Sequence, residues 1–256
     1  MNDLDKFQKL INIIKKLRAP GGCDWDRKQT STSLIPYLTE EAYEVIDAIE
    51  QSDTSALREE LGDLLLHVLF QAEIRSEKND FDIFDSIDSV CNKLIKRHPE
   101  VFNDSDKDNV VEKGSWEKRK KIEKNRKSIL EGVPNSLPGL LRARRIQEKA
   151  SSVGFDWKNH RPVIEKIQEE LDEVNDAIKN HGKEEVTMEI GDLLFAVVNL
   201  SRFFEIDPER ALKKSTNKFI KRFNSIEERI KLDGGEIKDY SSEFMESLWN
   251  EIKKDE

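Results

Sequence analysis

The sequence predicts an all-α protein built from two copies of one helical domain. Charged residues make up 37% of its 256 residues and hydrophobic residues 36%, with only 7 Pro and 11 Gly. This composition favours solvated helices over a turn-rich β-sandwich or a low-complexity chain. Apolar residues recur at helical spacing, and several blocks of sequence occur twice in the same order. The chain is long enough for two domains of ordinary size.

The helices follow from the spacing of apolar residues. Between residues 3 and 18, apolar side chains recur three and four positions apart, which places them on one buried face of a helix. The same spacing predicts helices in the first half over residues 3–18, 35–51, 55–78 and 83–97. In the second half it predicts helices over residues 137–151, 161–180, 183–204 and 208–232. The polar stretch 104–114 predicts a mobile loop, after which Ser115 can cap a helix that runs to about Glu131.

Repeated blocks identify a duplication. Residues 40–44 and 60–65 both recur 129 positions further on, as residues 169–173 and 189–194. The pairs 92–97 with 217–222, and Trp116 with Trp249, extend the match at similar offsets. Two Pro and two Gly between positions 132 and 139 mark the boundary. We therefore predict domains at residues 1–131 and 132–256.

Charge and hydropathy exclude several classes of protein. The net charge of −9 has the wrong sign for a general nucleic-acid or membrane-surface binder. The apolar runs are far shorter than the roughly 18 residues that span a bilayer, and the first residues lack a signal-peptide core. We expect a cytoplasmic protein with no membrane partner and no nucleic-acid partner.

Four carboxylates in each copy form the strongest candidate site. Glu41 and Glu44 lie three apart on one predicted helix, and Glu60 and Asp63 lie three apart on the next. Antiparallel packing of these helices would bring all four acids together. The repeated set consists of Glu170, Glu173, Glu189 and Asp192. Because oxygen ligands without His or Cys suit hard cations, the pattern predicts Mg²⁺ or Mn²⁺.

Two simpler explanations compete with a metal site: a solvated acidic face, and acids that only complement a helix dipole. Against both, Glu60 and Glu189 lie beyond the first helical turn and lead into the apolar runs 64–70 and 193–198, which places them at the edge of a core. His67 follows Asp63 by four positions, but its counterpart is Ala196. We therefore predict that His67 is a core or supporting residue and not a ligand.

The duplicated carboxylate pattern resembles the MazG family of nucleoside triphosphate pyrophosphohydrolases. Residues 22–30, 97–102 and 154–157 also resemble family segments, and the likeness covers nearly the whole chain. It implies an all-α fold in which helices from two subunits build each site. It further implies Mg²⁺-dependent hydrolysis of NTP or dNTP to nucleoside monophosphate and pyrophosphate, as in clearance of the nucleotide pool.

The resemblance also assigns residues. It implies that the two carboxylate sets are metal ligands. In the second copy it implies that the nucleotide is contacted by Lys166, Glu169, Lys218, Arg222 and Trp249. The first-copy matches are Glu40, Lys93, Arg97 and Trp116. A triphosphate carries about four negative charges, which Lys218, Lys221 and Arg222 on one helix could meet. Glu169 is our candidate general base or supporting residue, beside the catalytic acids Glu170, Glu173, Glu189 and Asp192.

Alternatives remain open at this level. Lys218 and Arg222 could form a solvated face, and Trp249 and Trp116 could be core anchors. The chain could also be a non-catalytic, Mg²⁺-dependent nucleotide-binding module that regulates a partner protein. We expect a homodimer, because the helix at 190–204 is apolar on nearly every face. We also expect the second domain to carry most of the hydrolysis, because its cationic helix is denser and no long polar loop precedes its Trp249.

Overall fold

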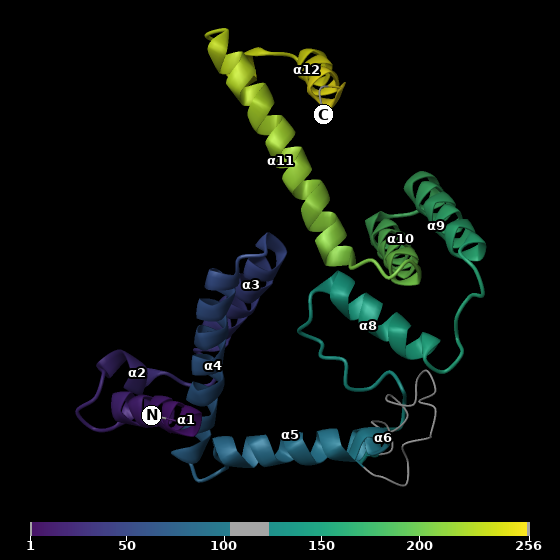
Figure 1. Ribbon diagram of the computed structural model, residues 1–256. Coiled ribbons are helices and arrows are strands. Elements are labelled where there is room, and N and C mark those ends of the chain that lie inside the picture. The colour runs from purple at the N-terminus through teal and green to yellow at the C-terminus, as the bar shows by residue number, and fades with distance from the viewer. Residues whose placement is uncertain (1, 103–122, 255–256) are drawn as a thin grey trace. The chain divides into compact units, whose positions relative to one another are not determined.

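The computed structural model describes residues 2–102 and 123–254, and within these residues the secondary structure is helical, with no strand. The chain divides into two compact units, residues 1–109 and 110–256. Figure 1 labels their helices. The predicted all-α class and the tandem organisation are confirmed.

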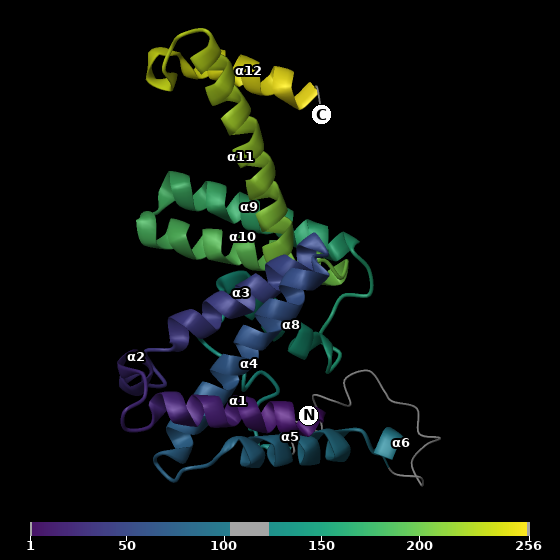
Figure 2. The ribbon, with the colours of Figure 1, turned by 60° about the vertical axis from the view of Figure 1, so that its left-hand side comes forward.

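The first unit is arranged around a long helix, α4. Helices α3 and α4 form an antiparallel hairpin, while α1 and α5 both pack against α4 (Figure 2). Its helices are α1 (Asp3–Arg18), α2 (Asp24–Lys28), α3 (Ile35–Gln51), α4 (Thr54–Ser76), α5 (Ile83–Arg97) and α6 (Pro99–Phe102). The core between α1 and α4 consists of Ile11, Ile14, Leu34, Leu69, Phe70 and Ile74.

Polar caps fix where these helices start. Asn2 and Asp82 each form a reciprocal capping box, and the side chain of Asp53 accepts hydrogen bonds from the first backbone amides of α4. Ser52 lies in the left-handed region, with φ of 57°, and turns the chain from α3 into α4. A connection of two residues therefore holds the hairpin together and sets the register of its two helices.

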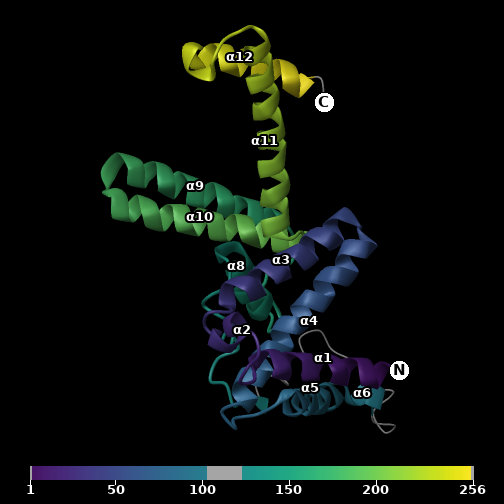
Figure 3. The same ribbon diagram turned by 90° about the vertical axis from the view of Figure 1, so that its left-hand side faces the viewer.

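The second unit repeats the hairpin. Helices α9 and α10 lie side by side, and α8 packs against α10 (Figure 3). The elements are α8 (Gly139–Ser151), α9 (Arg161–Asn180), α10 (Lys183–Phe203), α11 (Pro208–Leu232), the 3₁₀ helix η2 (Ile237–Asp239) and α12 (Ser242–Lys254). Helix α12 folds back on the far end of α11, where Ile226, Ile230 and Ile252 form a small core.

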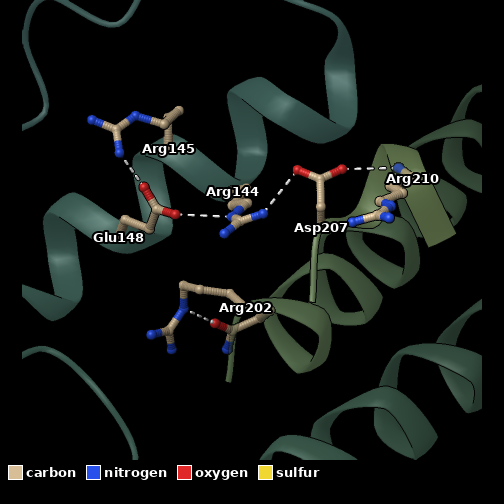
Figure 4. Close-up of polar contacts among 7 residues, drawn as sticks. Arg144, Arg145, Glu148, Arg202, Asp207 and Arg210 are labelled. Atoms are coloured by element: carbon tan, nitrogen blue, oxygen red, sulfur yellow. Dashed lines mark hydrogen bonds and ion pairs between the residues drawn. The ribbon is translucent and has the colours of Figure 1, made fainter. Parts of the chain in front are cut away.

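Ion pairs anchor the start of α11 to α8. The guanidinium of Arg144 lies 2.9 Å from the carboxylate of Glu148 and 2.8 Å from that of Asp207 (Figure 4). Asp207 also caps α11 by accepting a hydrogen bond of 2.8 Å from the backbone amide of Arg210. A single carboxylate thus stabilises both the helix start and its packing on α8.

Most predicted helices occur within a few residues of their predicted bounds. The predicted helix running to Glu131 is wrong where the chain is described, because residues 124–131 form turns. Asn125 has a positive φ of 48°, a conformation that ends a helix and that Asn tolerates better than most residues. The predicted loop at 104–114 and Trp116 lie outside the described residues.

The division into units falls earlier than the predicted domain boundary at 131/132. Residues just before the predicted boundary belong to the second unit, within which Lys149 Nζ donates a hydrogen bond of 2.9 Å to the carbonyl of Ile129. The boundary of the duplicated domain itself stays a prediction. Over the described ranges, none of the helices combines the length and the apolar character needed to cross a membrane.

Candidate active site

The α9–α10 hairpin of the second unit gathers three carboxylates. Glu170 and Glu173 come from α9 and Glu189 from α10, and each offers an oxygen within 4.8 Å of the others. Glu170 is 6% exposed, whereas Glu173 is exposed at the surface. A set of oxygen donors at this separation suits a hard divalent cation.

The α3–α4 hairpin of the first unit gathers a corresponding group. Here Glu41 comes from α3, and Glu60 and Asp63 come from α4, again with oxygens within 4.8 Å. The antiparallel packing expected from the sequence therefore does bring acids of both helices together. Each group holds three of the four predicted ligands: Glu44 and Asp192 lie outside the two groups.

Burial, together with mutual repulsion, raises the pKa of several of these acids. Burial raises the pKa of Glu41, and the charges of Glu44 and Asp63 raise it further. Burial and the charge of Glu44 likewise raise the pKa of Glu60. Glu44 is therefore electrostatically part of the first group. In the second unit, burial and the neighbouring Glu170 raise the pKa of Glu173. Crowded carboxylates of this kind are stabilised by a cation.

The second unit supplies one cation of its own. Lys166 Nζ lies 2.8 Å from Glu169 Oε1 and 2.6 Å from Glu170 Oε1. Hydrogen bonds to these two carboxylates raise the pKa of Lys166 above its ordinary value. Lys166 thus compensates the buried charge of Glu170. Glu169, the candidate base, has a side chain that is 59% exposed and is held beside the group by the same lysine.

A pocket of about 150 Å³ adjoins this cluster. Lys166, Glu170 and Asp192 provide its charged wall. Its remaining lining is formed by Trp157, Val163, Phe195, Ala196 and Asn199. Asp192 therefore lies at the site even though it is outside the group of three.

In the first unit, aromatic rings occupy the neighbourhood of the carboxylates. The ring of His67 stacks on Tyr37 with centroids 6.4 Å apart, and Trp25 meets Tyr37 edge-on at 5.8 Å. His67 is buried, and its Nε2 lies 3.8 Å from Glu41 Oε1. Burial lowers the pKa of His67 despite the nearby charge of Asp63. His67 thus supports a carboxylate from within the core.

The predicted cationic contacts lie elsewhere in the second unit. Lys218, Lys221 and Arg222 lie near the middle of α11, a helix that leads away from the α9–α10 pair (Figure 1). Trp249 of α12 packs on this part of α11, 5.1 Å from the Phe219 ring and 5.4 Å from the Arg222 guanidinium. As far as the chain is described, the structure does not gather these residues with the carboxylates of the same subunit.

The first-unit counterparts are also dispersed. Lys93 and Arg97 lie on α5, where Arg97 is 4% exposed, and Glu40 lies at the surface of α3. Trp25, Tyr37 and Trp157 are not among the predicted site residues, although Trp157 lines the pocket and Trp25 meets Tyr37, which stacks on His67. The signal was present in the segments 22–30 and 154–157, each of which contains Asp-Trp.

Comparison with known proteins identifies relatives over the whole chain. The sequence profile described as the MazG nucleotide pyrophosphohydrolase domain matches twice, at residues 29–102 and 158–226. The chain is 47% identical over 249 residues to the nucleoside triphosphate pyrophosphohydrolase/pyrophosphatase MazG of Thermotoga maritima, covering 96% of this chain and 95% of that protein. It is 42% identical over 265 residues to the nucleoside triphosphate pyrophosphohydrolase of Escherichia coli, covering 100% and 99%.

Proposed function

The chain belongs to the MazG nucleotide pyrophosphohydrolase family, and from this premise we propose that it hydrolyses nucleoside triphosphates to nucleoside monophosphate and pyrophosphate. The observation that carries the proposal is the group formed by Glu170, Glu173 and Glu189 beside a cationic lysine. The names of the relatives, both of which match over nearly their full length, support the same reaction. Clearance of unwanted NTP or dNTP from the nucleotide pool is the physiological role that fits this activity.

The donor set fits Mg²⁺ or Mn²⁺. Glu170, Glu173, Glu189 and Asp192 would hold the ion in the second unit, and Glu41, Glu44, Glu60 and Asp63 in the first. When bound, the ion supplies charge neutralisation for the triphosphate and makes water a better nucleophile at neutral pH. The raised pKa values of Glu41, Glu60 and Glu173 support a site in which a cation is expected.

The protein's own residues have separable roles. Lys166 is placed to donate to phosphate oxygens, because its ammonium already lies at the mouth of the carboxylate group. Glu169 is placed to accept a proton from the attacking water, since it is exposed next to the cluster and is oriented by Lys166. We propose that Lys218, Lys221, Arg222 and Trp249 contact the nucleotide bound by a partner subunit.

A homodimer supplies that partner. Large apolar residues stay exposed on both helices of the second hairpin, including Ile164, Leu171, Ile190 and Leu194. Such patches on a single chain indicate an interaction surface. A second copy of the hairpin would cover them and bring another α11 toward the carboxylates. A cytoplasmic location stays a prediction.

The reaction is tested by separating its products. With Mg²⁺ and a panel of NTPs and dNTPs, we expect monophosphate and pyrophosphate in equal amounts, and no turnover after chelation. Diphosphate and orthophosphate would indicate another class of phosphohydrolase. Nucleotide binding without turnover would favour the alternative, a regulatory module that acts through a protein partner.

The dimer is tested by light scattering combined with complementation. Mixing Glu173→Ala protein with Arg222→Ala protein should restore part of the lost activity, because one mixed site keeps both sets of residues. A monomeric, fully active protein at micromolar concentration would contradict a shared site.

A further inference from the structure

We propose that Arg144 and Asp207 are positioning residues, which set the direction of helix α11 so that its cationic side chains reach the nucleotide bound by a partner subunit. This inference rests on the proposed function, in which Lys218 and Arg222 act on the site of another subunit. The ion pair between Arg144 and Asp207 belongs neither to the carboxylate group of the second unit nor to the lining of the adjacent pocket.

The middle of α11 gains little support from its own subunit. The helix contacts α8 and α10 near its start and α12 near its far end (Figure 1). Between these contacts every residue from 210 to 221 is exposed, including the apolar side chains of Leu212, Phe219 and Ile220. Because α12 folds back on α11 itself, the direction of α11 within the subunit is set mainly where the helix begins.

At this start, Asp207 is held by both of its carboxylate oxygens. Its Oδ2 accepts a hydrogen bond of 2.8 Å from Nη1 of Arg144, and its Oδ1 accepts one of 2.8 Å from the backbone amide of Arg210 (Figure 4). The first bond ties the carboxylate to α8, and the second ties it to the first turn of α11. Rotation of α11 relative to α8 must therefore strain one of the two bonds.

Arg144 is itself held in place. Its Nε donates a hydrogen bond of 2.9 Å to Glu148, one turn further along α8, and Glu148 also accepts a bond from Arg145. The side chain of Arg144 is only 22% exposed, so water competes with the pair less than at an open surface. A planar guanidinium that binds two carboxylates has a defined orientation, which makes Arg144 a rigid anchor for α11.

A small tilt at this anchor has a large effect further along the helix. At a rise of about 1.5 Å per residue, Arg222 lies about 22 Å from Asp207, and a tilt of about 5° would move it by about 2 Å. A misplacement of about 1 Å can cost about 100-fold in rate. The positive charge of α11 is therefore useful only if the helix also has the right direction.

The test uses full-length Arg144→Met and Asp207→Asn, because Asn still caps α11 but removes the charge of Asp207. Arg142→Met is the matched control, since Arg142 also lies on α8 but donates to Asn135. With Mg²⁺ and NTP, we expect kcat/KM for pyrophosphate release to fall about 10- to 100-fold in the first two variants. The control should stay within about twofold of wild type, and Arg144→Lys should recover part of the loss.

Complementation separates the direction of α11 from general damage. Arg144→Met protein keeps its carboxylates, so it should regain activity when it is mixed with Glu173→Ala protein, whose α11 is intact. It should regain none with Arg222→Ala protein, because every mixed site then lacks a working α11. Restoration by Arg222→Ala, or by neither protein, would overturn the proposal.

The direction of α11 is also measured without catalysis, from the distance between spin labels at Lys179→Cys on α9 and Glu227→Cys on α11. The exposed native thiols are removed as Cys23→Ser and Cys91→Ser, and labelled protein is diluted with unlabelled protein. Arg144→Met and Asp207→Asn should shift or broaden the distance distribution by about 2 Å or more, and Arg142→Met should not. Unchanged distances would overturn the proposal, as would unchanged activity in a variant whose distances change.

The two failures can be told apart. Wild-type protein that releases no pyrophosphate would refute the proposed function, whereas the label distances would still decide whether the ion pair sets the direction of α11.

Discussion

The α3–α4 and α9–α10 hairpins carry the same carboxylates at the same spacing but surround them differently. In the first unit Glu41 lies 3.8 Å from His67, whose ring stacks on Tyr37. In the second unit the acids meet Lys166 and an open pocket with Trp157 in its wall. The two hairpins therefore share a set of acids but differ in the side chains around that set, and this difference is what would make their binding properties unequal.

The two hairpins also differ in how they balance charge. In the second group, burial and the neighbouring Glu170 raise the pKa of Glu173, and the ammonium of Lys166 lies 2.6 Å from Glu170 and offsets part of the negative charge. The first group has Tyr37 at the equivalent position, and both Glu41 and Glu60 have raised pKa values. The second hairpin is therefore better prepared to accept an anionic, metal-bound ligand.

Removing the positive charge of Lys166 should greatly reduce NTP hydrolysis, because only the second hairpin has a lysine at this position. For Lys166→Met we expect kcat/KM for NTP hydrolysis to fall about 10- to 100-fold, since a charge-assisted hydrogen bond to phosphate is lost. Pyrophosphate release as a function of NTP concentration measures the change. The matched variant Tyr37→Phe, which removes one hydroxyl at the equivalent position, should stay within about twofold. Similar losses in both variants would mean that the two hairpins contribute equally.

A smaller effect concerns the ion pair between Asp156 and Arg202, whose closest atoms lie 2.6 Å apart. Asp156→Asn should lower the free energy of unfolding by about 1–3 kcal/mol at pH 7, measured by urea denaturation, because it weakens the pair with Arg202. Asp24, the corresponding acid of the first unit, has a side chain that is 84% exposed and lies 3.4 Å from Arg27. Asp24→Asn should therefore cost less than about 0.5 kcal/mol.

The stability that the Asp156–Arg202 ion pair contributes should depend on pH in one direction. Burial would raise the pKa of Asp156, but hydrogen bonds from Arg202 and Ser151 outweigh it and lower the pKa below the ordinary value of 3.8. A carboxyl with a lowered folded pKa stabilises the protein above pH 3.8, and this contribution is lost as the pH falls through the folded pKa. The stability difference between wild type and Asp156→Asn should thus shrink below pH 3.8. A difference that stays constant to pH 2.5 would contradict the assignment.

The smallest expected effect is in proton release on metal binding. Carboxyl groups with raised pKa values keep protons above pH 4.5, and these protons must leave when Mg²⁺ binds. Affinity should therefore fall as the pH is lowered toward 4.5. The number of protons released per Mg²⁺ bound is measured by calorimetry in two buffers at pH 5.5. The first hairpin is studied in Glu189→Gln protein and the second in Glu60→Gln protein. We expect the first hairpin to release a fraction of a proton more than the second. Equal release would mean that Lys166 does not balance the second group.

Much of the fold could be predicted because its signals are local. Asp53 and Asp82 are polar caps immediately before apolar-periodic segments, and the helices α4 and α5 begin directly after them. The turns at residues 124–131, where a helix was predicted, could not be predicted in this way. They depend on the left-handed conformation of Asn125, which composition favours only weakly.

The sequence predicted that the two hairpins gather acids, but it did not predict the side chains around those acids. Three-residue spacing and hairpin packing placed Glu41 near Glu60, and Glu170 near Glu189. The stacking of Tyr37 on His67 could not be read from spacing, because it joins side chains from two helices. The contact of Trp249 with α11 could not be read from spacing either. It depends on how the chain between α11 and α12 folds.

The most direct test of the unequal hairpins is pyrophosphate release by two equivalent variants, Glu173→Ala and Glu44→Ala, each checked for retained helicity and dimerisation. We predict that Glu173→Ala loses at least about 100-fold in kcat, more than changes in supporting residues around a metal usually cost. Glu44→Ala should retain more than half of the wild-type turnover. If Glu44→Ala abolishes turnover while Glu173→Ala stays near wild type, the first hairpin is the working site and the account is wrong.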